Sequence, residues 1–357
     1  MLILTHAGLG SLLARPVWPR ESATLAEMSS RILVLTHAEV EALLPMAECI
    51  ELMASTLAAL ARGEAHQPLR MIVRPPGAAG LVALMPSYIG GTTPVFGVKT
   101  IGVFQGNVAR GLDAHKGGML LISGESGELL ALLNASAITA VRTAAVSGVA
   151  TRLLAREDAA ELALVGAGVQ ARSHLLAMAC VRPLRRVRVA SRSRERAEAL
   201  AAELRPQVRF AIELAPTVET AVRGADIIVT VTSSAEPMLR REWIADGAHL
   251  NVVGASLPTA REVDSDMMAA ARLFVDRRES TLTEAGDYLI PAREGRIGPD
   301  HIRAELGEVL IGSRPGRTGA SEITLFKSLG LAVEDLAAAQ FLYHRAQERG
   351  AGSWVEF

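Results

Sequence analysis

The chain has 357 residues, half of them hydrophobic, and a formal net charge of −1. This length predicts a large core and two domains. A nearly neutral chain with 4 % aromatic residues lacks the electrostatic field and the stacking platforms typical of nucleic-acid or anionic-membrane binding. Two cysteines, Cys49 and Cys180, form neither a disulfide framework nor a zinc-binding pattern, and no apolar run reaches transmembrane length. We therefore expect a cytoplasmic protein without a metal site.

The first half of the chain has the pattern of a strand-rich α+β domain. Residues 1–28 are expected to be a peripheral N-terminal extension, with Met28 as an alternative start. A strand at 32–35 precedes a capping box, Thr36 with Glu39, that opens a helix. An amphipathic helix follows, and then short strands with antiparallel patterning at 69–74, 81–84, 95–104, 118–122 and 128–133, before a helix of small residues at 137–155.

The pattern changes near residue 160, where apolar strands alternate with helical stretches. The strands are predicted at 162–165, 186–190, 227–231, 249–253 and 273–275. This alternation is typical of a parallel sheet with helical crossovers. We predict an α/β fold with a Rossmann-type, doubly wound parallel-sheet domain at 151–326. The strand-rich α+β domain at 29–150 would serve substrate binding and dimerisation, completed by residues 327–357.

A glycine-rich turn follows the first of these parallel strands. Gly166, Gly168 and Ala171 stand at the Gly-x-Gly-x-x-Ala spacing that lets a strand, a tight turn and a helix cradle a dinucleotide pyrophosphate. The helix N-terminus offers unpaired N–H groups to an anion. In a glycine-rich chain this triplet alone is weak evidence for a dinucleotide site. The strand before it and the helix-compatible segment after it strengthen the prediction.

The end of the next strand bears on the choice of nucleotide. Folds that prefer NAD usually place Asp or Glu there, but this chain has Ser191, Arg192 and Ser193. Arginine and hydroxyl groups bind a 2′-phosphate by charge-assisted hydrogen bonds. We therefore favour NADPH, with NADH possible. In the alternative interpretation, Ser193 caps the next helix and the arginine is solvated.

Three cationic residues lie in apolar surroundings. Arg70 is in a strand-like run, Lys99 alternates onto the same strand face as Val95 and Ile101, and Arg142 is in a helix of small residues. Buried charges require partners, and no carboxylate is near these residues in sequence. A bound anion such as a substrate carboxylate would satisfy them. Pairing with carboxylates from elsewhere in the chain remains an open alternative.

Seven blocks in a fixed order then give the chain a recognisable pattern over roughly residues 30–348. They are GVKT at 97–100, FQGN at 104–107, AHKG at 114–117, RTAA at 142–145, GAGVQA at 166–171, NVVGAS at 251–256 and FKSLG at 326–330. Together they resemble the ornithine cyclodeaminase/mu-crystallin family. The resemblance implies a homodimer that joins sheets across a two-fold axis and a substrate site in the cleft between the domains.

The resemblance also implies roles for individual residues. Arg70, Lys99 and Arg142 match positions that bind the carboxylate of an amino or imino acid, and Lys99 matches the proton donor of the reducing members. His115 matches a histidine that lines the substrate site. From the patterns above and the resemblance together, the residues expected to bind the cofactor are Thr143, Gly166, Gly168, Val169, Gln170, Ser191, Arg192, Ser193, Thr232, Ser233, Val253, Gly254, Gly330 and Leu331.

One position departs from the cyclodeaminase pattern. Those enzymes place an aspartate after the glycine that matches Gly254, where it acts on the substrate amine, but this chain has Ser256. A hydroxyl group without an activating partner is not a comparable base at neutral pH. Mu-crystallin-like ketimine reductases and pyrroline-2-carboxylate reductases carry serine there, so Ser256 is expected to help in proton transfer; alternatively it only shapes a turn.

We therefore predict an NADPH-dependent reductase of cyclic imino acids, with Δ1-pyrroline-2-carboxylate reduced to L-proline and piperideine-2-carboxylate as a second substrate. Ornithine cyclodeaminase or alanine dehydrogenase activity is one alternative. A non-catalytic, mu-crystallin-like protein that binds NADPH and a small ligand is another. The expected partners are the imino or amino acid and a second copy of the chain, without nucleic acid or membrane.

Overall fold

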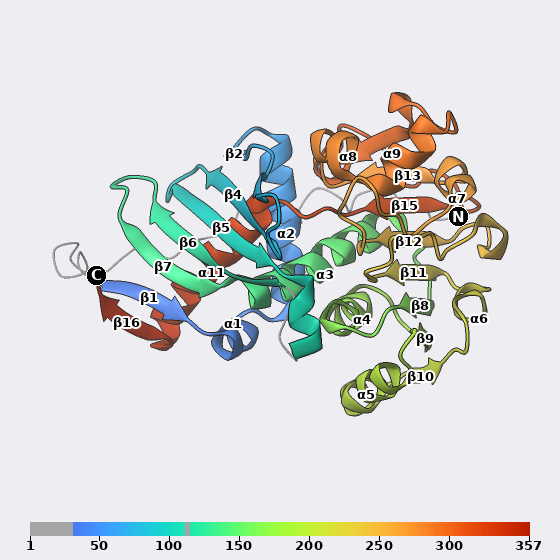
Figure 1. Cartoon of the computed structure of the whole chain (residues 1–357), viewed down its shortest axis with the longest axis horizontal. Helices are drawn as coiled ribbons and strands as arrows, with labels where there is room; N and C mark the ends of the chain where they lie inside the picture. The colour runs from blue at the N-terminus through green and yellow to red at the C-terminus, as the bar shows by residue number, and fades with distance from the viewer. Residues whose placement is uncertain (1–30, 111–114) are drawn as a thin grey trace, which may run out of the picture.

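The computed structural model describes residues 31–110 and 115–357, and the predicted extension at 1–28 lies outside them. The chain forms two eight-stranded sheets that lie side by side with helix α3 (Ala135–Leu154) running between them (Figure 1). The predicted fold class is confirmed, since one sheet is wholly parallel and the other is largely antiparallel.

The largely antiparallel sheet has the strand order β16-β1-β7-β6-β5-β4-β2, with β3 beside β4. A tight turn with Gly127 in the left-handed region (φ 77°) joins β6 to β7. The strands are β1 (Arg31–Leu35), β2 (Ala65–His66), β3 (Met71–Val73), β4 (Leu81–Ile89), β5 (Val95–Val103), β6 (His115–Ser123), β7 (Leu129–Asn134) and β16 (Ser353–Glu356).

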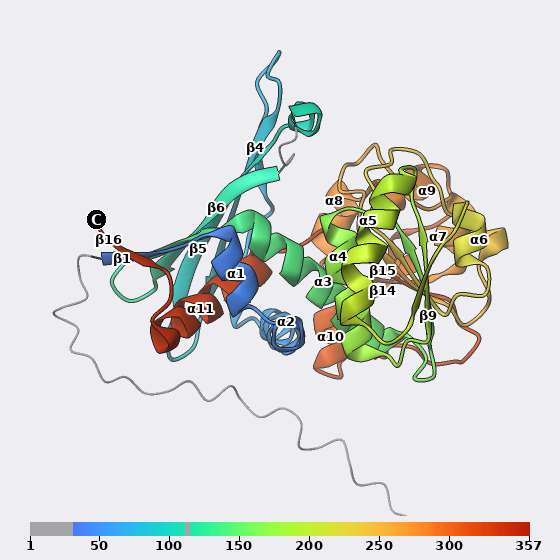
Figure 2. The ribbon, with the colours of Figure 1, turned by 90° about the horizontal axis from the view of Figure 1, so that it is seen from below.

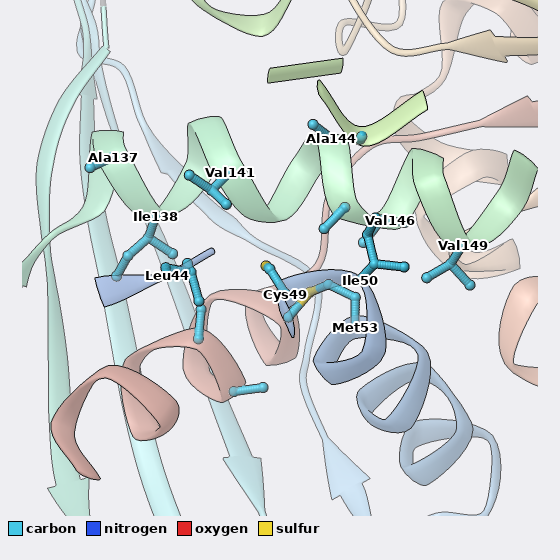
Figure 3. Close-up of a cluster of buried hydrophobic side chains, with 14 of the residues drawn as sticks. Leu44, Cys49, Ile50, Met53, Ala137, Ile138, Val141, Ala144, Val146 and Val149 are labelled. Carbon is cyan, nitrogen blue, oxygen red and sulfur yellow. The ribbon is translucent and has the colours of Figure 1, made fainter. Parts of the chain in front are cut away.

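Helices cover one face of this sheet (Figure 2). They are α1 (His37–Leu43), α2 (Met46–Ala61), α3 and α11 (Ala332–Arg349). Thr36 and Glu39 form the predicted capping box of α1, and the Asn134 side chain caps α3. Figure 3 shows Ile50 and Met53 of α2 directed toward Val146 and Val149 of α3.

Helix α3 connects the two halves of the molecule because its side chains are small. A Cβ atom on Gly148 would lie 3.1 Å from Ile50 of α2 and 3.7 Å from Ala177 of α4 (Val169–Val181). The Ser147 hydroxyl lies 3.0 Å from Nε2 of His174 on α4. The side chains at the cofactor turn and at the antiparallel sheet are therefore positioned by one shared helix.

The parallel sheet has the order β10-β9-β8-β11-β12-β15-β13-β14. The chain runs outward from β8 in both directions, so the switch point where such sheets bind ligands lies between β8 and β11. The strands are β8 (Glu161–Val165), β9 (Arg186–Ala190), β10 (Ala211–Leu214), β11 (Ile227–Thr230), β12 (His249–Val252), β13 (Arg272–Val275), β14 (Ile302–Glu305) and β15 (Thr324–Lys327).

The remaining helices surround the parallel sheet. They are α5 (Arg194–Leu204), α6 (Val218–Val222), α7 (Ser265–Ala270), α8 (Arg278–Glu284), α9 (Gly286–Arg293) and α10 (Leu306–Leu310), with 3₁₀ turns at Gln105–Arg110, Arg205–Gln207, Arg241–Trp243 and Pro299–His301. Among the described helices, none alone has the length and hydropathy of a membrane span, and α1 with α2 reach it only as a pair bent by 83°.

Three strands of the parallel sheet, β10, β14 and β15, lack a clear signal in the sequence. Each has four residues and includes a charged side chain, for example Lys327 in β15. Such segments do not show the continuous apolar run expected of a buried parallel strand. Lys327 is nevertheless fully buried, because Asp287 lies 3.0 Å from its Nζ.

Candidate functional site

Two arginines from separate parts of the chain meet at Gly330, directly before α11. Nη2 of Arg70 donates to the carbonyl oxygens of Leu329 (3.0 Å) and Gly330 (3.2 Å). Gly330 is in the left-handed region (φ 78°), and a Cβ atom there would lie 2.6 Å from Nη1 of Arg142. Only glycine therefore fits at this position, for reasons of both backbone conformation and space.

Lys99 and Arg142 share one carboxylate. Lys99 is 2 % exposed on the inner face of β5, as the alternation predicted. Its Nζ donates to Asp335 Oδ1 (3.0 Å) and Oδ2 (3.1 Å) and to the Thr139 hydroxyl (2.6 Å). Nε of Arg142 also donates to Asp335 Oδ1, at 2.9 Å. Asp335, on the first turn of α11, thus orients both cations.

All three predicted cations have carboxylates from elsewhere in the chain as partners. Glu284 pairs with Arg70 at 2.9 Å, and Glu334 accepts from Nη1 of Arg142 at 2.6 Å. Of the two alternatives that the sequence left open, pairing with carboxylates from other parts of the chain is therefore the one present in the structure. Two edges remain open: Nη1 of Arg70 and Nη2 of Arg142 form no hydrogen bond with any described residue.

Burial shifts the protonation equilibria of this cluster toward neutral forms. Burial raises the pKa of Glu334 to about 7, against the opposing effect of Arg142. Burial lowers the pKa of Lys99 to about 8; Asp335 opposes that change and Arg142 adds to it. Burial also raises the pKa of Asp276, whose Oδ2 accepts from the N–H groups of Leu329 (2.5 Å) and Gly330 (2.7 Å). The pKa values of Lys99 and Glu334 therefore both lie near neutral pH.

A small pocket, partly open to solvent, lies beside this cluster. One side comes from the antiparallel sheet, including Arg70 and Met85, which is the cross-strand partner of Lys99. The other side comes from Ser280 on α8 and from Gly330. The pocket thus offers the guanidinium of Arg70 to the acid group of a small molecule between the two sheets. The lining residues are Gln67, Pro68, Leu69, Arg70, Met85, Ser280, Gly330 and Ala332.

The glycine-rich turn after β8 has the form that a dinucleotide requires. A Cβ atom on Gly166 (φ 123°) would lie 2.8 Å from the carbonyl oxygen of Val231, whereas one on Gly168 would meet nothing within 4 Å. No side chain caps the N-terminus of α4. Gln170 donates to the Thr139 carbonyl at 3.3 Å, while its buried Oε1 has no partner. Open space and free N–H groups together fit a pyrophosphate, whereas the Gln170 oxygen is an acceptor and needs a donor from elsewhere.

Glu262, which the sequence analysis missed, holds the two loops after β11 and β12 in place. Its carboxylate accepts from the N–H and the hydroxyl of Thr232 (both 2.9 Å), from the Thr230 hydroxyl (2.9 Å) and from the N–H of Gly254 (2.6 Å). Burial raises its pKa. These loops carry Ser233 and Val253 to the same sheet edge as the glycine turn, since all of these strands are parallel.

Ser193 and Arg192, which follow β9, differ in their environment: the serine caps a helix and the arginine is exposed. Ser193 accepts from the N–H of Arg196 (3.2 Å) and caps α5, and its own N–H donates to the Ser191 hydroxyl (3.2 Å). The capping interpretation therefore holds for Ser193. Arg192 is exposed and pairs with no carboxylate in the described part of the chain, so its guanidinium is available to a ligand.

The other predicted residues are more scattered. Ser256 is exposed on the loop after β12, and no contact among the described residues joins it to the cation cluster. His115 is the first residue of β6 and pairs with Val103 of β5. Thr143 is buried on α3 beside Arg142. Leu331 is the N-cap residue of α11, with its N–H donating to Glu334 at 3.1 Å.

Comparisons with known proteins agree with this architecture. The model of the ornithine cyclodeaminase/mu-crystallin family matches residues 31–350. The ketimine reductase mu-crystallin of Mus musculus is 40 % identical over 281 residues, which are 79 % of this chain and 85 % of that protein.

Two solved structures are similar in fold. The Δ1-pyrroline-2-carboxylate reductase of Thermococcus litoralis, in complex with NADH and L-proline, has a TM-score of 0.88 and 37 % identity, covering 90 % of this chain and 99 % of that one. An archaeal alanine dehydrogenase dimer with bound NAD has a TM-score of 0.86 and 30 % identity, covering 92 % of this chain and 99 % of that one. The chain belongs to the ornithine cyclodeaminase/mu-crystallin family.

Proposed function

We propose that this protein is an NADPH-dependent reductase of cyclic imino acids, which reduces the C=N bond next to a carboxylate. Its preferred substrate would be Δ1-pyrroline-2-carboxylate, giving L-proline, with piperideine-2-carboxylate as a second substrate. The observation that carries the proposal is that Arg70, with a free Nη1, lines the small pocket, while Arg142, with a free Nη2, packs against Gly330 in the lining of the same pocket. The names of the mouse and Thermococcus relatives support the same chemistry.

In this mechanism the arginines orient the substrate. The substrate carboxylate binds Nη1 of Arg70 and Nη2 of Arg142 by charge-assisted hydrogen bonds, which fixes the imine carbon relative to the cofactor site. The dinucleotide supplies the hydride when bound. Lys99, held by Asp335 and Thr139, keeps a proton at neutral pH with a pKa of about 8 and supplies it toward the imine nitrogen.

The cofactor is assigned to the open side of the glycine turn. Gly168, the α4 N-terminus and Gln170 would hold the pyrophosphate, and the loops fixed by Glu262 would lie along the nicotinamide half. Arg192 would bind a 2′-phosphate, with Ser191 next to it. The unpaired guanidinium of Arg192 supports NADPH over NADH, since the β9 end carries no carboxylate to bind the ribose hydroxyls.

The loop that carries Ser256 argues against ornithine cyclodeamination. Family members with that activity carry an aspartate at this position, and Ser256 offers neither a base nor a charge for an ammonium group. NADPH oxidation should be measured with pyrroline-2-carboxylate, piperideine-2-carboxylate, and pyruvate plus ammonia. Turnover with the cyclic imines supports the proposal. Turnover with pyruvate and ammonia alone would favour an alanine dehydrogenase, and tight NADPH binding without any turnover would favour a binding protein.

We also propose that the protein is a homodimer that pairs through the uncovered face of the antiparallel sheet. Apolar side chains at Val73 (47 % exposed), Val82 (37 %), Phe96 (48 %) and Leu132 (38 %) lie on this face, and such a patch is unusual on a monomer. The archaeal alanine dehydrogenase with a similar fold is a dimer, which supports a dimer here. Light scattering should give twice the chain mass, and Phe96→Asp should shift the protein to monomer; a monomeric parent protein would refute this assignment.

A further inference from the structure

Glu284 is a carboxylate of the site that has no role in the proposed imine reduction. It ends α8, and its Oε2 lies 2.9 Å from Nε of Arg70, with each side chain 17 % exposed. Ser280, one helical turn earlier on α8, lines the same pocket as Arg70. Because residues four apart share a helix face, Glu284 lies on the side of α8 that borders the pocket.

The contact between Glu284 and Arg70 leaves both groups with unused capacity. Oε2 of Glu284 is close to Nε, but it lies outside the hydrogen-bonding direction of that N–H group and has no hydrogen-bond partner. Arg70 uses Nη2 for the carbonyl groups of Leu329 and Gly330, which leaves Nη1 open. A carboxylate without a hydrogen bond and a free N–H donor therefore lie side by side next to the pocket; Oε2 of Glu284 is itself buried, and Arg70 lines the pocket.

The other acids of the cluster are committed elsewhere. Both oxygens of Asp276 accept from backbone N–H groups. Asp335 is shared by Lys99 and Arg142. Glu334 is fully buried; its Oε2 accepts from Arg142 and from the N–H of Leu331, and its Oε1 has no hydrogen-bond partner. Of the two acids around Gly330 that have an oxygen without a hydrogen bond, Glu284 is the one whose side chain is partly exposed.

We propose that Arg70 and Glu284 together form a site for a zwitterion, in which Arg70 binds the carboxylate and Glu284 accepts from the protonated nitrogen of a 2-imino or 2-amino acid. Both groups of such a ligand are bonded to one carbon, so a carboxylate on Nη1 brings the N–H within reach of Glu284. A 2-keto acid would instead turn its carbonyl oxygen toward the carboxylate, which is repulsive. Glu284 thus selects nitrogen over oxygen at the reacting carbon.

This inference rests on the proposed function and is tested by binding, independently of turnover. L-proline and tetrahydrofuran-2-carboxylate have the same ring size and the same carboxylate. They differ only in the ring atom next to C2, which is NH₂⁺ in L-proline and an oxygen in the analogue. With saturating NADP⁺, calorimetry should show the full-length protein binding L-proline at least about tenfold more tightly, the effect of one charge-assisted hydrogen bond. Glu284→Gln should reduce this ratio to nearly one while the oxygen analogue keeps its affinity within about threefold.

Two further variants complete the test. Glu279→Gln removes an exposed carboxylate from the same helix and should keep the wild-type ratio. Glu284→Asp keeps the charge and should restore part of the selectivity. If Glu284→Gln weakens the binding of both ligands equally, Glu284 only supports Arg70 and the proposal is wrong. The proposal is also wrong if the wild-type protein binds neither ligand, or binds both with the same affinity. Selective proline binding without imine turnover would refute the reductase but retain the zwitterion site.

Discussion

Replacing Asp335 by asparagine tests whether the shared carboxylate sets the protonation state of Lys99. The Asn side chain has the same shape but no charge, and it leaves Lys99 and Arg142 buried together without their common counter-ion. Two unit charges about 4 Å apart interact by about 4 kcal/mol at an effective dielectric constant of about 20. Because 1.36 kcal/mol corresponds to a tenfold change in a proton equilibrium, even half of that energy would bring the pKa of Lys99 from about 8 to below 7.

The assay is the pH dependence of kcat/KM for imine reduction. If protonated Lys99 donates the proton, activity falls as the pH rises through the pKa of Lys99, near 8 in the wild type. Asp335→Asn should move this alkaline limb below pH 7, so that activity at pH 8 falls about tenfold or more and recovers partly at pH 6. Thr139→Val is the control, since it removes the other acceptor of Lys99 without changing the charge. A uniformly lower profile with an unmoved limb would refute the role of Asp335 in setting this proton equilibrium.

Four further outcomes are expected. Lys99→Met should reduce turnover by about a hundredfold or more while the NADPH dissociation constant stays within about threefold; equal losses in both would indicate a structural lysine. Arg192→Asp should raise KM for NADPH and spare KM for NADH, and unchanged selectivity would contradict the phosphate assignment. Gly330→Ala adds about 1–2 kcal/mol of left-handed strain and displaces Arg142, so KM for the imino acid should rise with NADPH binding intact; an unchanged KM would contradict the site. Glu334 has a pKa of about 7 and gains its negative charge above that pH, so KM for the carboxylate substrate should rise with pH there, and Glu334→Gln should flatten this rise.

The parts of the fold that follow local rules could be predicted from the sequence. The capping box at Thr36, the cap at Asn134 and the turn at Gly166 each depend on residues within a few positions of one another. Lys99 was placed on the inner face of its strand because alternation with Val95 leaves no other choice. The short strands β10, β14 and β15 escaped prediction because the pairing of neighbouring strands, rather than their own composition, makes them strands.

The cationic residues of the site could be predicted from the sequence, but not all of its acidic residues could. The cations stand out because each interrupts an apolar pattern, and Glu334 and Asp335 do so as well at the start of α11, which otherwise begins with buried apolar residues. Buried charges of opposite sign must pair, so these two acids could have been matched to Lys99 and Arg142 from the sequence. Glu284 could not, since it ends a short helix among polar residues. Its burial arises only when α8 packs beside Arg70, so the residue proposed to select the substrate nitrogen is visible in the folded chain alone.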